Sequence, residues 1–295
     1  MLLCLSSYIS SPIALVGGFV IVYLFGHPFT ELNHKAVNIL LKVAVVGLGF
    51  GMNITETLEA GKDGFLLTVF SILFTLVLGY FIGKKLGMEK RTSHLLSSGT
   101  AICGGSAIAA VAPVINATEK DMLVSLGVVF LLNSIALVIF PILGHLLGLT
   151  QHQFGLWSAI AIHDTSSVVG AAYAYGDEAL KVATTVKLAR ALWIIPLSLA
   201  SLYFFKGKGK SIKIPWFIFL FIVAILLNSY LPIPKILTHG ITTSSKSLLV
   251  LTLFLIGAGL SVEKIKSAGW KPMILGLSLW ISISIVSILI ILFIV

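Results

Sequence analysis

The feature that most constrains this chain is a near-continuous series of apolar runs, each about as long as a membrane is thick. Of the 295 residues, 58% are hydrophobic and 11% are charged, and the mean hydropathy is +1.07. Soluble domains carry about 25% charged residues, and a membrane-spanning helix needs about 20 apolar residues. Little chain is left between the apolar runs, so no separate soluble domain fits. We therefore predict an all-α, polytopic transmembrane helix bundle in which residues 1–295 form a single integral membrane domain.

The apolar runs predict about ten transmembrane spans, two of which are broken or re-entrant. The predicted spans are residues 9–26, 36–52, 64–83, 94–115, 121–148, 154–175, 179–205, 214–231, 246–262 and 272–294. Lysine and arginine gather mainly in the loops that follow the odd-numbered spans. The positive-inside rule then places those loops in the cytoplasm, so we expect both termini outside the cell (plasma) membrane.

The net charge of +9 does not indicate a nucleic-acid partner, because the positive residues lie in short clusters between apolar runs. The two cysteines, Cys4 and Cys103, have no neighbours at metal-ligand or redox-motif spacing. Motifs for nucleotide hydrolysis, zinc or serine hydrolases are also missing from the sequence. We expect no enzyme activity, no cofactor and no metal. The expected partners are the lipid bilayer and a small ligand, and the sequence is compatible with a homo-oligomer.

A short internal sequence similarity bears on the architecture. Residues 47–50 (GLGF) resemble residues 257–260 (GAGL), and seven spans separate the two segments, which gives them opposite orientations. Secondary transporters are commonly built from inverted repeats. A similarity over four residues does not distinguish an inverted repeat from chance, so both interpretations stay equally open.

The first break is the run of small and hydroxyl residues at 97–110 (SSGTAICGGSAIAA) inside an apolar segment. Backbone groups freed at membrane depth are tolerated only inside protein or against a wet cavity, so this break is a candidate binding site. The alternative is close helix packing through a small-xxx-small pattern at Gly105 and Ala109. Packing alone does not call for four hydroxyl groups. The candidate binding residues are Thr100, Gly104, Gly105 and Ser106.

The second break, residues 162–171 (IHDTSSVVGA), falls near the middle of its predicted span. An aspartate there costs about 2.5–3.5 kcal/mol on insertion scales, so Asp164 is expected to have a partner or to face a wet cavity. The alternative is a structural break closed by side-chain hydrogen bonds. The candidate residues here are His163, Asp164, Thr165 and Ser166.

The next span carries two cations, Lys187 and Arg190, at a spacing that places them on one helix face. They are the expected partners of Asp164. The planar fork of arginine suits an oxyanion, whereas lysine offers a mobile charge. In the alternative, Lys187 snorkels outward and Arg190 only neutralises Asp164. With His163 neutral, the embedded set has one excess positive charge, which favours a small anion as the ligand.

Four segments together carry a family resemblance: residues 46–52 (VGLGFGM), 98–110, 161–171 and 184–191 (TTVKLARA). In these segments the chain resembles the YeiH-like family of conserved bacterial membrane proteins, whose members are described as sulfate exporters. The resemblance implies a secondary transporter. It also implies that an additional N-terminal helix of the family is missing here or reduced to residues 1–8.

Taken together, residues and resemblance predict a secondary-active transporter that exports a small anion, sulfate or a related sulfur-containing oxyanion, coupled to protons or another ion. The predicted substrate-binding residues are Thr100, Gly104, Gly105, Ser106, Thr165, Ser166 and Arg190. The predicted ion-coupling residues are His163, Asp164 and Lys187. Two other classes stay open: a cation/proton antiporter that uses Asp164, and a non-transporting membrane sensor or scaffold.

Overall fold

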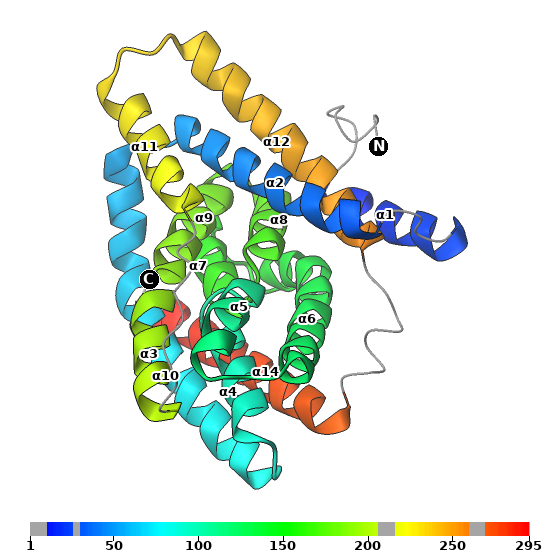
Figure 1. The fold of residues 1–295 in the computed structure, drawn as a ribbon. Coiled ribbons are helices and arrows are strands. Elements are labelled where there is room, and N and C mark those ends of the chain that lie inside the picture. The colour runs from blue at the N-terminus through cyan, green and yellow to red at the C-terminus, as the bar shows by residue number, and fades with distance from the viewer. Residues whose placement is uncertain (1–10, 26–29, 206–215, 260–268, 295) are drawn as a thin grey trace.

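A computed structural model describes residues 11–25, 30–205, 216–259 and 269–294. Every regular element in these ranges is helical, which confirms the predicted all-α class. The elements are α1 (Ser11–Phe25), α2 (Thr30–Leu48), the 3₁₀ turn η2 (Gly49–Gly51), α3 (Ile54–Lys85), α4 (Lys90–Ala101), α5 (Gly105–Val114), α6 (Glu119–Leu146), α7 (Gln151–Ala161), α8 (Thr165–Tyr175), α9 (Asp177–Ala191), α10 (Ile194–Phe205), α11 (Phe217–Tyr230), α12 (Lys235–Ala258) and α14 (Trp270–Ile294) (Figure 1).

Five segments of the described chain are long and apolar enough to cross a membrane. They are Gly64–Lys85, Glu119–Leu146, Asp177–Phe205, Lys235–Ala258 and Trp270–Phe293. A sixth is counted if Lys35–Gly51 and Ile54–Lys62, which meet at 110°, form one bent span. The predicted count of ten is therefore not confirmed, although each predicted span contains a helix. Five predicted spans are not among these segments. The two broken ones each divide into helices of 10 to 12 residues, α1 and α11 have only 15 and 14 residues, and the α2 span counts only as part of the bent pair.

The helices form two layers. Helices α1 and α2 run alongside α12, and α11 packs on α2 and η2; we call these elements the panel (Figure 1). The remaining helices, α3 to α10 and α14, form the core bundle. The panel contacts the core bundle through α8, which meets α1 and α12, and through α3, which meets α11.

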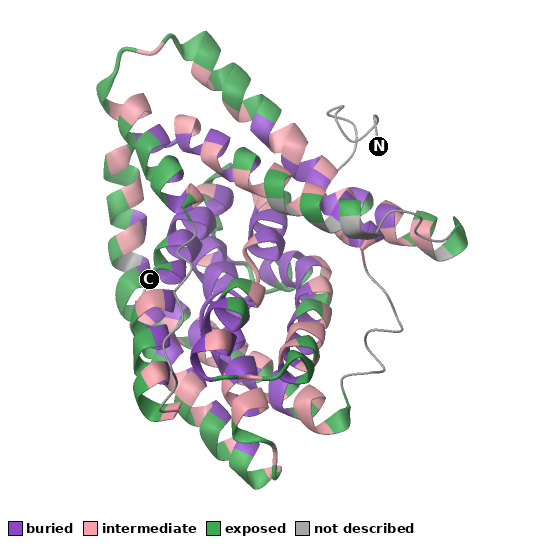
Figure 2. Cartoon of the chain, viewed as in Figure 1, coloured by how far each residue is buried: buried purple, intermediate pink, exposed green. Residues whose placement is uncertain are grey.

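Buried residues concentrate in the core bundle, most of all on α7, α8 and α9 (Figure 2). Helix α9 packs against α3, α7 and α8, and small residues on its neighbours allow this close approach. A Cβ atom on Gly155 of α7 would lie only 2.8 Å from Cβ of Val182 on α9. The helix that carries Lys187 and Arg190 is thus enclosed by other helices.

Capping residues determine where two core helices begin. Thr118 and Asp121 form a reciprocal capping box at the start of α6, and Thr150 and Gln153 do the same for α7. Each box satisfies backbone N–H groups that a helix start leaves without partners. The sequence therefore specifies where α6 begins and where α7, the helix before the second break, begins.

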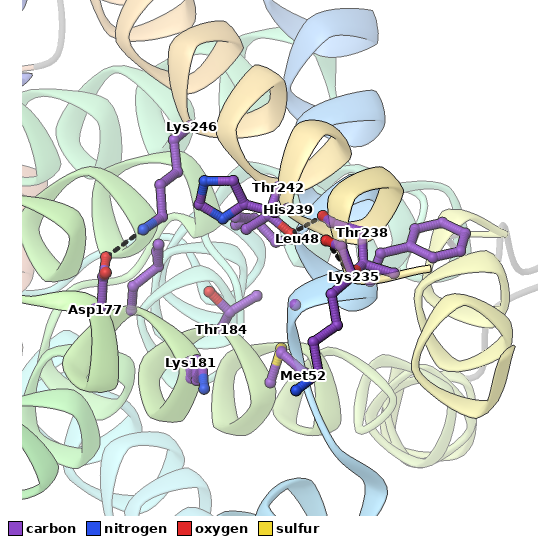
Figure 3. A pocket seen from close by; sticks show the side chains of 13 residues that line it. Leu48, Met52, Asp177, Lys181, Thr184, Lys235, Thr238, His239, Thr242 and Lys246 are labelled. Carbon is purple, nitrogen blue, oxygen red and sulfur yellow. Dashed lines mark hydrogen bonds and ion pairs between the residues drawn. The ribbon is translucent and has the colours of Figure 1, made fainter. Parts of the chain in front are cut away.

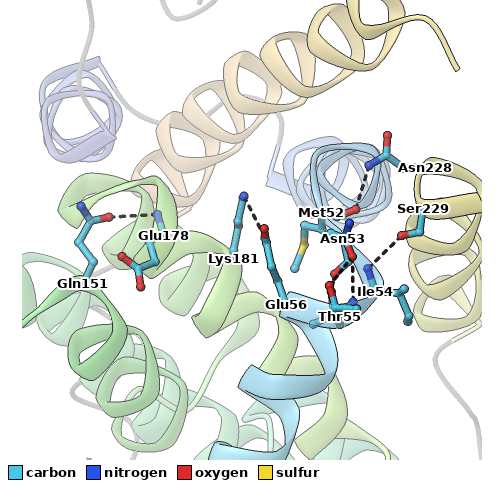
Figure 4. Close-up of polar contacts among 11 residues, drawn as sticks. Met52, Asn53, Ile54, Thr55, Glu56, Gln151, Glu178, Lys181, Asn228 and Ser229 are labelled. Atoms are coloured by element: carbon cyan, nitrogen blue, oxygen red, sulfur yellow. Dashed lines mark hydrogen bonds and ion pairs between the residues drawn. The ribbon is translucent and has the colours of Figure 1, made fainter. Parts of the chain in front are cut away.

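The sharp bend between the panel and α3 is held by polar contacts from α11 (Figure 4). Asn228 Nδ2 donates to the Met52 carbonyl at 2.9 Å, and Ser229 Oγ accepts from the Ile54 N–H at 2.9 Å. Asn53 caps α3 by accepting from the Thr55 N–H. The bend is consequently a defined joint, in which backbone groups outside regular helix find side-chain partners.

Candidate functional site

The first break lies between α4 and α5 and depends on Gly104. Its φ is +63°, in the region that favours glycine, and its N–H donates to the Gly99 carbonyl at 2.8 Å. A Cβ on Gly99 would lie 2.8 Å from Cδ1 of Ile108, nine residues later. Nine residues of straight helix would span about 13 Å. Helix α5 therefore turns sharply away from the axis of α4.

The second break lies between α7 and α8, where Asp164 caps the new helix. Its carboxylate accepts hydrogen bonds from the N–H groups of Ser166 at 3.0 Å and Ser167 at 3.4 Å, and from the Ser166 hydroxyl. An aspartate is well suited to this position, because a negative charge favours the positive end of the helix dipole. The carboxylate stays partly accessible.

The two breaks meet inside the core bundle. A Cβ on Gly104 would lie 3.5 Å from both Cα and N of Asp164, and 3.2 Å from Cγ1 of Val129 on α6. A Cβ at position 104 would be in van der Waals contact with the Asp164 backbone, while the positive φ and the tight distance to Val129 favour glycine there. The starts of α5 and α8 consequently lie next to one another; we call this meeting point the crossover.

Asn133 of α6 holds the second break in place. Its side-chain oxygen accepts hydrogen bonds from the N–H groups of His163 at 3.0 Å and Asp164 at 3.2 Å. These are two of the backbone groups that the break leaves without helical partners. Asn133 belongs to the site, and the sequence prediction had left it out.

Arg190 of α9 binds the carbonyl ends of both broken helices. Its Nε donates to the Ala101 carbonyl at 2.7 Å, Nη2 donates to the same oxygen, and Nη1 donates to the Ile160 carbonyl at 2.9 Å. The side chain is fully buried. All three guanidinium nitrogens thus serve the last turns of α4 and α7.

Lys187, also fully buried, does the same for α7. Its Nζ donates to the carbonyls of Ile162 at 2.8 Å and Ala159 at 3.2 Å. The alternative in which Lys187 snorkels outward is therefore wrong. Helices end with carbonyl groups that lack partners and with a partial negative charge, and both features attract cations.

The ion pairs expected between Asp164 and these cations do not occur within the described part of the chain. The ion pairs found there join other residues. The physical reason is the geometry of the breaks, because each one exposes a positive helix start and a negative helix end. Asp164 serves the start of α8, while Lys187 and Arg190 serve the ends of α4 and α7.

Several buried polar atoms around the crossover have no hydrogen-bond partner among the described residues. They are the hydroxyls of Ser98, Thr100, Thr184 and Thr185, Nδ2 of Asn133 and both ring nitrogens of His163. Buried polar groups in native proteins are nearly always satisfied, by protein, water or a ligand. Such a cluster indicates a polar interior that accommodates water or solute.

The remaining predicted residues differ in burial. Gly105 and Thr165 are half-buried at the starts of their helices, and Ser166 is buried against Asp164. Ser106 is exposed, one position into α5 from Gly105. No group of three or more His, Cys, Asp or Glu side chains suited to a metal ion occurs in the residues that the structure covers.

Fold and site together define a multi-pass membrane protein built around two broken helices that meet in its interior. A family profile described as conserved hypothetical protein 698 matches residues 9–276. The chain therefore belongs to this family, the YeiH-like membrane proteins, as the resemblance implied.

Curated relatives agree over nearly the whole chain. A UPF0324 membrane protein of Bacteroides thetaiotaomicron is 52% identical over 282 residues, which cover 95% of this chain and 85% of the relative. One of Photobacterium profundum is 53% identical over 285 residues, covering 96% and 87%. One of Shewanella oneidensis is 50% identical over 292 residues, covering 99% and 92%. No solved structure matches.

Proposed function

We propose that this protein is a secondary-active transporter that moves a small anion across the cell membrane through the crossover. The observation that carries the proposal is the meeting of two helix starts, at Gly104 and Asp164, in front of two fully buried cations. Helix starts inside a membrane protein are recurrent binding places for anionic groups, and charges at that depth usually serve function. Sulfate or a related sulfur-containing oxyanion is the proposed substrate.

The charge balance supports an anion over a cation. A helix terminus carries roughly half an elementary charge, positive at the start and negative at the end. The starts of α5 and α8 therefore roughly balance Asp164, and the ends of α4 and α7 balance one of the two cations. With Lys187 and Arg190 both protonated, about one positive charge is in excess.

The donors for the anion are the free backbone groups of α5. Gly104 has no side chain to cap this helix, so the first N–H groups, including those of Gly105 and Ser106, lack partners of this kind. Thr100 adds an unpaired buried hydroxyl from the other side of the break. Thr165 adds a half-buried hydroxyl at the start of α8. Arg190 contributes a fixed positive charge at a distance, because its guanidinium binds the carbonyl ends of α4 and α7.

Coupling to protons follows from the same balance. Loss of one proton from Lys187 would remove the excess positive charge that favours the anion. Each proton bound would therefore offset one negative charge of the anion, and the two would move together. Two further positions for a proton are Asp164 and His163, whose buried ring nitrogens have no hydrogen-bond partner among the described residues. Alternating access would be movement of the panel relative to the core bundle.

A cation/proton antiporter is the competing function, because the partly accessible Asp164 carboxylate at the crossover also suits a cation. Counterflow of radiolabelled sulfate in proteoliposomes separates the two. We expect sulfate exchange that is independent of sodium. Sodium or proton exchange without any sulfate flux would overturn the anion proposal, and a wild-type protein silent in both assays would favour a sensor or scaffold.

We also propose that both termini lie outside. A reporter fused to the C-terminus tests this arrangement, since alkaline phosphatase is active outside and green fluorescent protein fluoresces in the cytoplasm. Phosphatase activity without fluorescence is expected. The opposite pattern would reverse the orientation without affecting the crossover.

A further inference from the structure

A second polar cavity lies between the panel and the core bundle, apart from the crossover (Figure 3). Its volume is about 360 Å³, and its walls come from η2 and the end of α2, from α12, and from α9. Pockets for small ligands run from about 300 to 1,000 Å³, so this one suits a small solute with some of its water.

Positive charges outnumber negative charges in the lining of the cavity. Lys181, Lys235 and Lys246 line it against a single carboxylate, Asp177, and His239 lies beside them (Figure 3). A cavity lined by one sign of charge between low-dielectric walls focuses the electric field and concentrates ions of opposite charge. The lining therefore favours an anion.

Two of the three lysines have carboxylate partners. Lys246 binds Asp177 at 2.5 Å, and Lys181 binds Glu56 of α3, outside the lining, at 3.4 Å (Figures 3 and 4). Lys235 forms no ion pair with any residue in the described ranges. Lys246 and Asp177 belong to opposite layers, so an anion that replaced the Asp177 carboxylate would act where panel and core bundle meet.

The cavity reaches toward the crossover through Thr184. This side chain is fully buried, lines the cavity, and has a hydroxyl without a hydrogen-bond partner among the described residues (Figure 3). Thr184 and Lys187 are neighbours at i, i+3 on α9, about 4.5 Å apart along the helix axis. An unsatisfied donor thus lies between the basic cavity and the buried lysine.

We propose that this cavity is a second anion-binding site, one that takes a small oxyanion on its way to or from the crossover. Lys246 binds the anion, Thr184 of α9 donates to it, and Asp177 competes with it for Lys246. Lys235, about 16 Å from Lys246 along the axis of α12, adds positive charge to the same cavity. Binding here does not require that the crossover transports anything. The site's place on the transport path rests on the proposed function.

Cysteine modification tests the binding site directly. Thr238→Cys places a thiol in the cavity wall, with Cys4 and Cys103 replaced by alanine. A sulfonate-bearing methanethiosulfonate should modify it at least about tenfold faster than a trimethylammonium-bearing one, each relative to its rate with a free thiol in solution. Sodium sulfate should slow the reaction, whereas sodium gluconate at equal ionic strength should not.

Matched variants locate the effect. Lys235→Gln with Lys246→Gln should abolish both the preference for the anionic reagent and the protection by sulfate. Lys62→Gln with Lys120→Gln, an equal loss of charge at exposed positions outside the cavity, should leave both intact. Asp177→Asn should lower the sulfate concentration that gives half-protection, an effect opposite to that of the lysine variants.

The proposal is overturned if sulfate gives no protection, or if the control pair loses protection as fully as the cavity pair. Working in phosphatidylcholine nanodiscs removes anionic lipid, and protection that appears only after anionic lipid is added would likewise overturn a small-anion site. If the cysteine variant does not fold, calorimetry of sulfate binding to the unlabelled protein and to the two lysine pairs decides the same question. Protection without sulfate flux in proteoliposomes would reject the transport function and retain this site.

Discussion

The backbone of Gly104 lies directly against the backbone of Asp164, so closely that a Cβ on the glycine would lie 3.5 Å from the aspartate Cα. These residues are sixty positions apart in the chain, and each marks a break in a helix. Their contact brings the starts of α5 and α8 together. Lys187 and Arg190 bind the ends of α4 and α7, and Asp164 caps α8, so helix termini of both signs gather at one place in the core.

Gly104→Ala should destabilise the protein by about 1–3 kcal/mol, because alanine is strained at this backbone conformation and its Cβ would meet Val129. Thermal unfolding of the detergent-solubilised protein measures the effect. Gly61→Ala is the control, since a helical Cβ there meets nothing within 4 Å and alanine favours the helix by about 1 kcal/mol. Equal melting temperatures for the two variants would contradict the close contact.

Asn133→Ala should destabilise the second break, because the buried N–H groups of His163 and Asp164 lose their acceptor, at about 1–3 kcal/mol for each. Unfolding in denaturant monitors the loss. The neighbouring Ser134→Ala should change stability by less than about 0.5 kcal/mol, since that hydroxyl only binds a carbonyl of its own helix. An equally large loss of stability in Ser134→Ala would show that α6 is generally sensitive to substitution, and would contradict a specific role for Asn133.

Arg190→Lys should lower stability while leaving the half-saturating sulfate concentration of transport unchanged. The substitution keeps the charge and loses the fork that binds Ala101 and Ile160, at about 1.5–3 kcal/mol per lost hydrogen bond. Arg91→Lys, at a half-buried position on α4, is the matched control and should unfold like wild type. A raised half-saturation at wild-type stability would instead make Arg190 a direct ligand of the anion.

Asp164→Asn should fold normally and exchange sulfate, yet accumulate less of it than wild type in response to a pH gradient, because one position for a proton is lost. Asparagine also caps helices, so the N–H groups of Ser166 and Ser167 keep an acceptor while the charge disappears. Flux with and without an imposed gradient in proteoliposomes gives the answer. Abolished exchange in Asp164→Asn, together with sodium-dependent proton movement in wild type, would support the cation antiporter.

The sequence predicted both breaks because glycine, hydroxyl and charged residues are costly inside an apolar span unless they serve a structure or a site. It also predicted that Lys187 and Arg190 belong to the buried centre. It assigned them the wrong partner, since a residue list shows charges and does not show the carbonyls that helix ends expose. The lysines of the second cavity, such as Lys235 and Lys246, counted only as loop charges that orient the chain. The spacing of Lys181, Thr184 and Lys187 on one helix was the available signal.

By itself, the sequence determined the membrane environment, the all-helical class and the positions where helices break, because these follow from local hydropathy and backbone preferences. The tertiary structure alone decided that Gly104 meets Asp164, that Arg190 joins the ends of α4 and α7, and that Lys246 reaches Asp177 across two layers. Such contacts depend on the rotation and tilt of helices far apart in the chain. Packing of whole helix faces sets those quantities, and no short stretch of sequence encodes them.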